Sequence, residues 1–150
     1  MNVKDELLKF NSFMEVIYGK HTKLSDILIK NSFSKDDIEF LKKEAIEKLL
    51  NNINLALQCK FICTSNKLRL YQIICRRYGL FGYNGATLRE IAADMGISHE
   101  RVRQLEEKAI KYLKPNNRSD FLSMAITVSA CQILNEDIST KLSQTDTDEP

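Results

Sequence analysis

The sequence contains few of the residues that interrupt helices. Only two prolines and five glycines occur among its 150 residues, and long intervals contain neither. Strand-rich folds need many turns, and turns depend on these residue types. The scarcity therefore excludes most β-rich architectures and predicts an all-α protein, a helical bundle.

Long apolar runs are also missing. No stretch approaches the roughly 20 apolar residues that a membrane helix requires. The N-terminal segment "MNVKDELLKFNSF" has no apolar run of the secretory type. We therefore expect a cytoplasmic protein with no membrane partner.

Metal-binding patterns are absent as well. No CxxC pair and no Cys/His cluster of zinc spacing occurs. We therefore expect no metal site and no cofactor, and we expect reduced cysteines that act as small buried apolar residues. The four cysteines are Cys59, Cys63, Cys75 and Cys131.

Catalytic arrangements are equally scarce. The only two histidines, His21 and His99, lie far apart in the sequence. Neither a nucleophile next to a base nor a phosphate-binding loop is visible. The prediction is therefore that the protein is not an enzyme and has no catalytic residues.

The charge is unevenly distributed. Residues 1–66 carry 10 Lys and Arg against 9 Asp and Glu, residues 67–118 carry 11 against 5, and residues 119–150 carry 1 against 6. The middle block is therefore strongly basic although the whole chain has a net charge of only +2. Positive charge concentrated in one block suits a polyanionic partner, although chance clustering on a solvated face would look the same.

Apolar residues recur at helical spacing along most of the chain. The pattern predicts helices over residues 4–18, with Gly19 as the stop, over 23–30, from the capping residue Ser34 to about Cys63, and over 67–78. The segment 121–134, "FLSMAITVSACQIL", has β-branched members, so a strand is conceivable. We prefer a helix packed on the bundle, because no other segment offers a sheet partner.

Residues 87–105 have the features of a helix-turn-helix motif. Thr87 and Glu90 form a capping box, and Gly96 provides the residue tolerant of positive φ that a sharp turn between crossing helices needs. Ser98 can cap the second helix. An ordinary helical hairpin is the alternative. The apolar positions of the two helices are Leu88, Ile91, Ala92 and Met95, then Val102 and Leu105, with Ile97 under the turn.

The exposed side of the second helix carries side chains suited to reading DNA. Arg can bond to guanine in a bidentate manner, Gln to adenine, and Glu can accept from cytosine. Residues at the flanks are better placed for phosphates. Glu107 is interpreted as a surface charge or a partner of Lys111. The DNA-binding candidates are His99, Glu100, Arg103 and Gln104 at base edges, Arg101, Arg89, Lys108 and Lys111 at the backbone, and the capping residues Thr87 and Ser98.

The segment 76–114, "RRYGLFGYNGATLREIAADMGISHERVRQLEEKAIKYLK", resembles region 4 of the bacterial sigma-70 family of transcription initiation factors. The string from Arg101 to Glu106, followed by Lys108 and Ala109, is its most specific part. The resemblance implies that Glu100 and Gln104 read bases, and that Arg101 and Arg103 contact the backbone or bases. It also implies two partners, the minus-35 promoter element and the flap of the RNA polymerase β subunit.

Two departures from the family pattern affect this interpretation. Primary sigma factors usually have arginine at the position held here by His99, so the preferred DNA sequence is expected to differ. Residues 1–66 contain no Trp, and most of their aromatic residues have core-type spacing, so no promoter-melting module is visible. The resemblance covers about a third of the chain.

These observations predict four segments. Residues 1–65 form an N-terminal helical lobe of unknown role, 66–116 a DNA-binding helix-turn-helix domain, 117–138 a C-terminal helix packed on the bundle, and 139–150 a disordered acidic tail. The expected function is a sequence-specific transcription regulator that binds duplex DNA at promoter-like sites with RNA polymerase. A second copy or another protein could bind through the N-terminal lobe. The alternative is a polymerase- or sigma-binding module that has lost DNA binding.

Overall fold

The structure, a computed structural model, describes the backbone of residues 2–62 and 67–147 and the side chains of residues 2–62 and 68–138. Eight helices occupy these two ranges, which contain no strand, so the all-α prediction is confirmed. The helices are α1 (Val3–Tyr18), α2 (Leu24–Lys30), α3 (Lys35–Lys43), α4 (Ile46–Ile62), α5 (Lys67–Tyr78), α6 (Leu88–Met95), α7 (His99–Leu113) and α8 (Phe121–Thr147).

Local signals set the limits of the first helices. Gly19 ends α1 in the left-handed region, at φ +69°, and its N–H donates to the Glu15 carbonyl. Ser34 caps α3, since its hydroxyl accepts a 3.1 Å hydrogen bond from the Asp37 N–H. Both features match the sequence predictions.

The single helix predicted from Ser34 to about Cys63 is wrong. The segment divides into α3 and α4, with Glu44 and Ala45 between them. From Leu41 to Leu57 its apolar residues recur every four positions, and each such step rotates the stripe by about 40° around a straight helix. A break lets both parts face the core. Cys63 and the predicted break at 64–66 lie outside the described residues. The residues expected on the inner side are indeed buried: Ile38, Leu41, Ala45, Leu49, Ile53 and Leu57.

One hydrophobic core connects the helices from α1 to α8. Aromatic contacts join α1 to α5 and the loop after it. The rings of Phe13 and Tyr78 lie 5.3 Å apart between centroids, and those of Phe10 and Phe81 lie 6.1 Å apart. The N-terminal helices therefore support the basic segment directly.

The last helix is longer than the sequence analysis expected. α8 buries Leu122, Ile126, Ala130 and Ile133, as predicted for a helix packed on the bundle, and it contacts α4 and α2. It then continues to Thr147, through most of the segment for which disorder was expected. No proline or glycine occurs between Pro115 and Pro150, so nothing in this part of the sequence interrupts the helix.

The cysteines do not share one environment. Cys75 is buried in α5, and burial raises the pKa of its thiol to about 12, so the thiol is protonated at neutral pH. Cys59 and Cys131 are exposed, so the prediction that the cysteines are buried is wrong for both. Cys63 lies outside the described residues.

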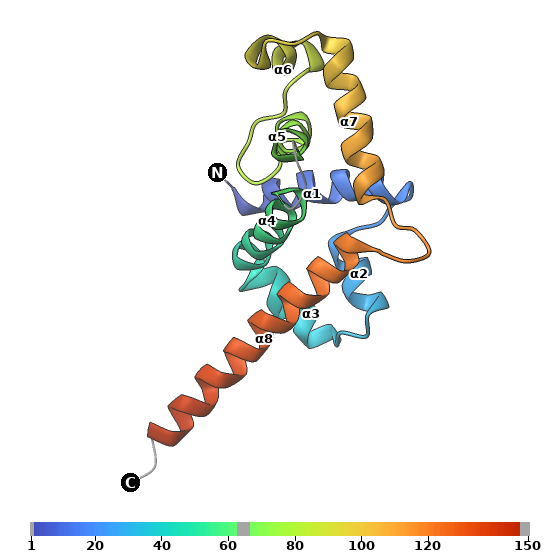
Figure 1. The fold of residues 1–150 in the computed structure, drawn as a ribbon. Coiled ribbons are helices and arrows are strands. Elements are labelled where there is room, and N and C mark those ends of the chain that lie inside the picture. The colour runs from blue at the N-terminus through green and yellow to red at the C-terminus, as the bar shows by residue number, and fades with distance from the viewer. Residues whose placement is uncertain (1, 63–66, 148–150) are drawn as a thin grey trace.

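The two ends of the molecule differ in construction (Figure 1). α6 and the start of α7 form one end, and α7 descends from there to the body. α8 leaves the body near α2 and α3 and extends toward the other end. Within the described ranges, no helix is both long enough and apolar enough to cross a membrane.

Candidate nucleic-acid interface

The helix-turn-helix is built from two capped helices and a glycine turn. The Thr87 hydroxyl accepts from the Glu90 N–H, and the Ser98 hydroxyl accepts from the Arg101 N–H, both at 3.1 Å. Gly96 lies between the helices at φ +68°, where a side chain would strain the backbone. The predicted caps and turn are therefore confirmed.

One detail of the predicted capping box differs. The Glu90 carboxylate accepts a 3.1 Å hydrogen bond from the Thr87 hydroxyl instead of from the Thr87 backbone N–H. The cap still fixes the start of α6, because the hydroxyl also satisfies a free N–H of the first turn.

The inner faces of α6 and α7 pack against each other as their spacing predicts. Ile91 and Val102 are fully buried, and Ala92 and Leu105 are nearly so. Ile97, which follows the turn, is partly buried against the same core. With these side chains turned inward, the polar side chains on the opposite face of α7 point to solvent.

Ion pairs and a hydrogen bond connect α6 and α7 to α5. Arg76 of α5 forms an ion pair with Asp94 of α6. The Tyr78 hydroxyl donates a 2.7 Å hydrogen bond to Glu106 of α7, and the Arg77 guanidinium lies 3.6 Å from the same carboxylate. Burial, and then the hydrogen bond to Glu106, raise the pKa of Tyr78, so its hydroxyl remains a donor at neutral pH.

The role of Glu106 as an anchor was missed from the sequence. A signal was present, because Glu106 is four residues after Val102 and three before Ala109. This places it beside the buried stripe of α7. An acid in that position needs a partner when partly buried, and the consecutive Arg77 and Tyr78 supply it.

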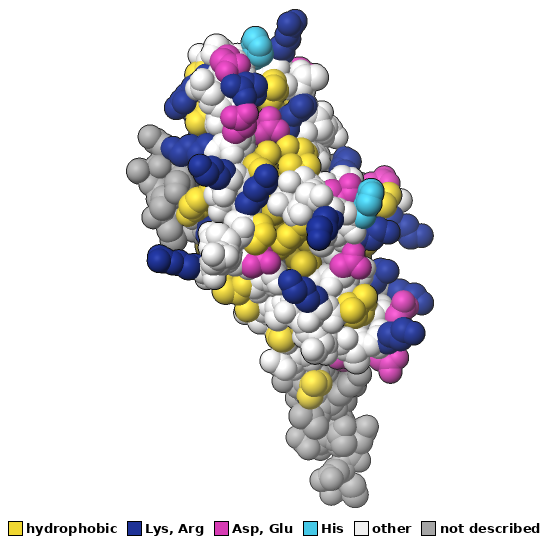
Figure 2. Space-filling view, turned by 90° about the vertical axis from the view of Figure 1, so that its right-hand side faces the viewer, with side chains coloured by type: hydrophobic (Ala, Val, Ile, Leu, Met, Phe, Trp, Pro, Cys, Tyr) yellow, Lys and Arg dark blue, Asp and Glu magenta, His cyan; other side chains and the backbone are white. Residues whose placement is uncertain are grey.

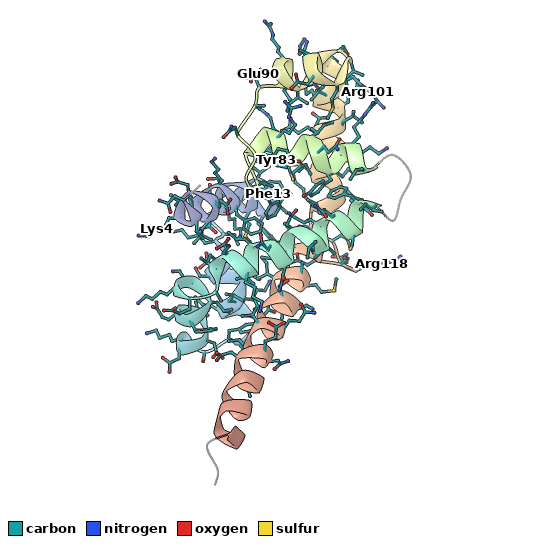
Figure 3. All side chains as sticks on the ribbon, turned by 90° about the vertical axis from the view of Figure 1, so that its left-hand side faces the viewer. Lys4, Phe13, Tyr83, Glu90, Arg101 and Arg118 are labelled. Atoms are coloured by element: carbon teal, nitrogen blue, oxygen red, sulfur yellow. The ribbon has the colours of Figure 1, made fainter. Side chains whose placement is uncertain are left out.

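All the predicted DNA-binding side chains are exposed. They lie along α6, the turn and the exposed face of α7. α6 and the start of α7 form the end of the molecule opposite the C-terminal part of α8 (Figure 3). Glu90 and Arg101 are labelled at this end, whereas Phe13 lies inside the body. The exposed set comprises Thr87, Arg89, Ser98, His99, Glu100, Arg101, Arg103, Gln104, Lys108 and Lys111.

Arg103 is held by carboxylates of its own helix. Its Nε and Nη2 donate to the two oxygens of Glu100, at 2.9 and 2.6 Å, and its Nη1 donates to Glu107. The hydrogen bond from Arg103 lowers the pKa of Glu100, and the one to Glu100 raises the pKa of Arg103. Both groups are therefore charged at neutral pH. Glu107 is an exposed surface charge, which is one of the two interpretations of the sequence, but its partner is Arg103 and not Lys111.

The neighbouring side chains are less constrained. Arg101 donates one long hydrogen bond, of 3.4 Å, to the Gln104 side-chain oxygen. That bond is weak, and it leaves most donors of the guanidinium free to bind an anion. Along the surface of this end, positive and negative side chains alternate (Figure 2). The site thus combines free cations with one internally neutralised arginine.

The described residues contain no group of three or more His, Cys, Asp or Glu placed to hold a metal ion. What α6 and α7 present is an exposed helical surface with hydrogen-bonding groups. Such a surface is suited to contact a groove or another protein.

The family described as "Sigma-70, region 4" matches residues 69–114 of this chain. This range covers α6, the turn, α7 and most of α5, the elements that build the surface described above. Residues 69–114 form a sigma-70 region 4-like domain.

Two curated proteins show the same relationship. The RNA polymerase principal sigma factor HrdC of Streptomyces coelicolor is 41% identical over 54 residues, which is 35% of this chain and 16% of that protein. The RNA polymerase sigma factor sigB of Arabidopsis thaliana is 30% identical over 105 residues, 70% of this chain and 14% of that protein. No solved structure matches the chain.

This chain therefore corresponds to a small part of these sigma factors. The similarity to the Arabidopsis protein extends over more of the chain than the region 4-like domain alone. Within the domain, the parts that define the fold are the caps, the Gly96 turn and the anchoring of α6 and α7 to α5.

Proposed function

We propose that the protein is a sequence-specific transcription regulator that binds duplex DNA through the region 4-like domain. It acts at promoter-like sites with RNA polymerase, as an accessory or partial sigma-like factor. The observation that carries this proposal is the exposed polar face of α7, with free cations around it, at one end of the molecule.

The second helix of a helix-turn-helix enters the major groove with its N-terminal residues toward the base edges. On α7 these residues are His99, Glu100, Arg103 and Gln104. Gln104 can bond to adenine and Glu100 can accept from cytosine. With His99 at the start of the helix, the bidentate guanine contact of an arginine is unavailable there.

Other residues of the surface are assigned to the DNA backbone. Arg89, Arg101, Lys108 and Lys111 are exposed cations on α6 and α7. Thr87 and Ser98 lie at the helix N-termini, where backbone N–H groups favour phosphates. These contacts orient α7, and the residues that face bases provide the discrimination.

The Glu100–Arg103 ion pair influences which bases α7 can recognise. Arg103 keeps the Glu100 carboxylate ionised and restricts its side chain. An oriented carboxylate can accept from cytosine and will repel phosphate or base acceptors. Arg103 must leave one of its two carboxylates before it contacts DNA, so Glu107 competes with the nucleic acid.

RNA polymerase is the proposed protein partner, through the β-subunit flap. The names of both relatives describe RNA polymerase sigma factors. Because the chain spans only 14–16% of these proteins, a complete initiation activity does not follow from the similarity. An accessory role requires only DNA binding and contact with polymerase.

The salt dependence of DNA binding tests the proposal. Anisotropy titrations of the full chain with labelled duplexes, over a series of salt concentrations, measure the number of phosphates neutralised. With about three to five contacts, log K should fall against log salt with a slope of about −2.7 to −4.5. The Arg118→Ala variant is the matched control, since Arg118 lies far from Arg101 (Figure 3) and should leave the slope unchanged. A flat dependence would overturn the proposal.

A second candidate is a polymerase- or sigma-binding module that has lost DNA binding. The neutralisation of Arg103 by Glu100 and Glu107 favours it, because it removes one positive charge from the face of α7. Co-purification with polymerase subunits, without any shift of duplex DNA, would support this candidate over the first.

A further inference from the structure

A second exposed surface lies between α4 and α8, away from the α6–α7 end. It is a groove of about 330 Å³ without a charged residue among its lining residues. The groove therefore differs in character from the charged α6–α7 surface. The groove is lined on α4 by Asn52, Leu55, Ala56 and Cys59, and on α8 by Phe121, Met124, Ala125, Val128, Ser129 and Gln132.

The outer face of α8 continues beyond this groove as a regular seam. Met124, Val128, Cys131, Asn135 and Ile138 follow one another at steps of four, three, four and three residues. All five are exposed, with exposed fractions of 56% for Met124, 49% for Val128 and 54% for Ile138. This spacing repeats every 3.5 residues on average, which is the spacing of a helix that packs against another helix.

The seam is distinct from the face that α8 buries. The core residues of α8 among the described ones end at Ile133, and they lie on the opposite side of the helix from the seam. α8 is thus apolar on two sides. A helix that is apolar all round is normally covered on both sides.

We propose that α8 of a second copy of this chain covers the groove, packed antiparallel to the first α8. The seam is self-complementary, because each copy supplies both an apolar ridge and a groove for the other. Residues 121–135 carry no charge, which removes like-charge repulsion from the centre of such a contact.

The charges at the two ends of the groove select the antiparallel orientation. Lys60 lies over the ring of Phe121, 4.7 Å from its centroid, at one end. At the other end Glu136 forms an ion pair with Lys48 of α4. An antiparallel pair keeps the Lys60 side chains of the two copies at opposite ends of the contact, whereas a parallel pair places these two like charges together.

The antiparallel arrangement also predicts a register. In antiparallel helices, a seam residue followed by a step of three packs beside a seam residue followed by a step of four. Val128 then lies beside position 131 of the second copy, and Met124 beside position 135. Asn135 is the one polar residue of the seam, and a single polar residue in such a seam restricts the register.

The mass of the full chain in solution tests the pairing. Light scattering at about 100 μM chain, above the Kd expected for a modest interface, should give twice the monomer mass of 17.3 kDa. Val128→Lys and Met124→Lys should each give the monomer mass with an unchanged circular-dichroism spectrum. Leu8→Lys, at a 64% exposed position on α1, should remain dimeric. A wild-type monomer at this concentration would overturn the proposal.

Disulfide mapping tests the orientation. In a Val128→Cys variant that also carries Cys59→Ser and Cys63→Ser, mild oxidation should join position 128 of one chain to Cys131 of the other. Links between two copies of position 128, or between two copies of Cys131, would contradict the antiparallel pair. Because no DNA is present in either experiment, their outcomes are independent of whether the chain binds DNA.

Discussion

The α6–α7 surface and the α4–α8 groove are both exposed to solvent, but their side chains have opposite polarity. The first is covered with charged and amide side chains that water solvates well. The second is lined by apolar and uncharged residues and runs into a regular apolar seam. A polar surface is stable without a partner, whereas an exposed apolar surface gains free energy when it is covered.

The comparison shows that exposure alone does not identify a binding site. On α7 the informative feature is which side chains are free and which are neutralised by neighbours. On α8 it is the regular spacing of exposed apolar residues. Substitutions on one surface should therefore leave the behaviour of the other unchanged.

The largest effect on DNA binding is expected for Arg103→Ala. The variant loses a candidate base contact and leaves Glu100 and Glu107 without their cation, next to the phosphates. We expect affinity for duplex DNA to fall about tenfold or more. Anisotropy titration measures it, with Arg118→Ala as the matched arginine control. Unchanged affinity would show that Arg103 is a structural partner of the two carboxylates and does not contact DNA. The mass in solution should not change.

An effect of opposite sign is expected for Glu107→Gln. The substitution removes one of the two carboxylates that hold Arg103, so the guanidinium becomes more available to DNA. We expect binding to unrelated duplexes to tighten by about threefold and the salt slope to steepen. Glu39→Gln, which removes the carboxylate that pairs with Lys43 on α3, is the matched control. Weaker binding by Glu107→Gln would contradict the idea that Glu107 competes with DNA.

The smallest effect is expected for Lys111→Ala. A lysine that contacts only phosphate contributes equally to all sequences, so affinity should fall by a similar small factor on every duplex. The salt slope should become shallower by about 1. Lys42→Ala, on α3, should change neither quantity. A loss confined to one DNA sequence would mean that Lys111 faces a base.

Much of the helix-turn-helix could be predicted because its signals are local. Thr87, Gly96 and Ser98 each act within one turn of chain, through a cap or a positive φ. The buried faces of α6 and α7 follow from periodicity. The same reasoning identified the exposed side of α7, since that side is what remains after the buried stripe is assigned.

Features that depend on contacts between distant segments could not be predicted in the same way. The break between α3 and α4 depends on how both helices meet the core. The anchoring of Glu106 depends on α5 lying beside α7. The ion pairs of Arg103 with Glu100 and Glu107 join residues only three and four positions apart. The sequence nevertheless allows several such pairings, and Lys111 was another candidate partner for Glu107.

The extent of α8 shows a different limit. Its acidic and polar C-terminal part has a composition typical of disordered tails, yet the helix continues to Thr147. Amino-acid composition indicates only the average preference of a segment for order or disorder. A helix that is already nucleated, in contrast, can continue through such a segment as long as no helix breaker interrupts it. The seam on its outer face is visible in the sequence once the helix and its buried side are known.

The most direct test of the central claim, that the exposed edge of α7 reads bases, is selection of binding sites from a random duplex library. The wild-type chain and the Gln104→Ala variant would be compared under identical salt. The account predicts that Gln104→Ala still binds duplex DNA but relaxes its preference at one base position, by about 1–3 kcal/mol of discrimination. Recovery of the same consensus with the same stringency at every position would contradict it.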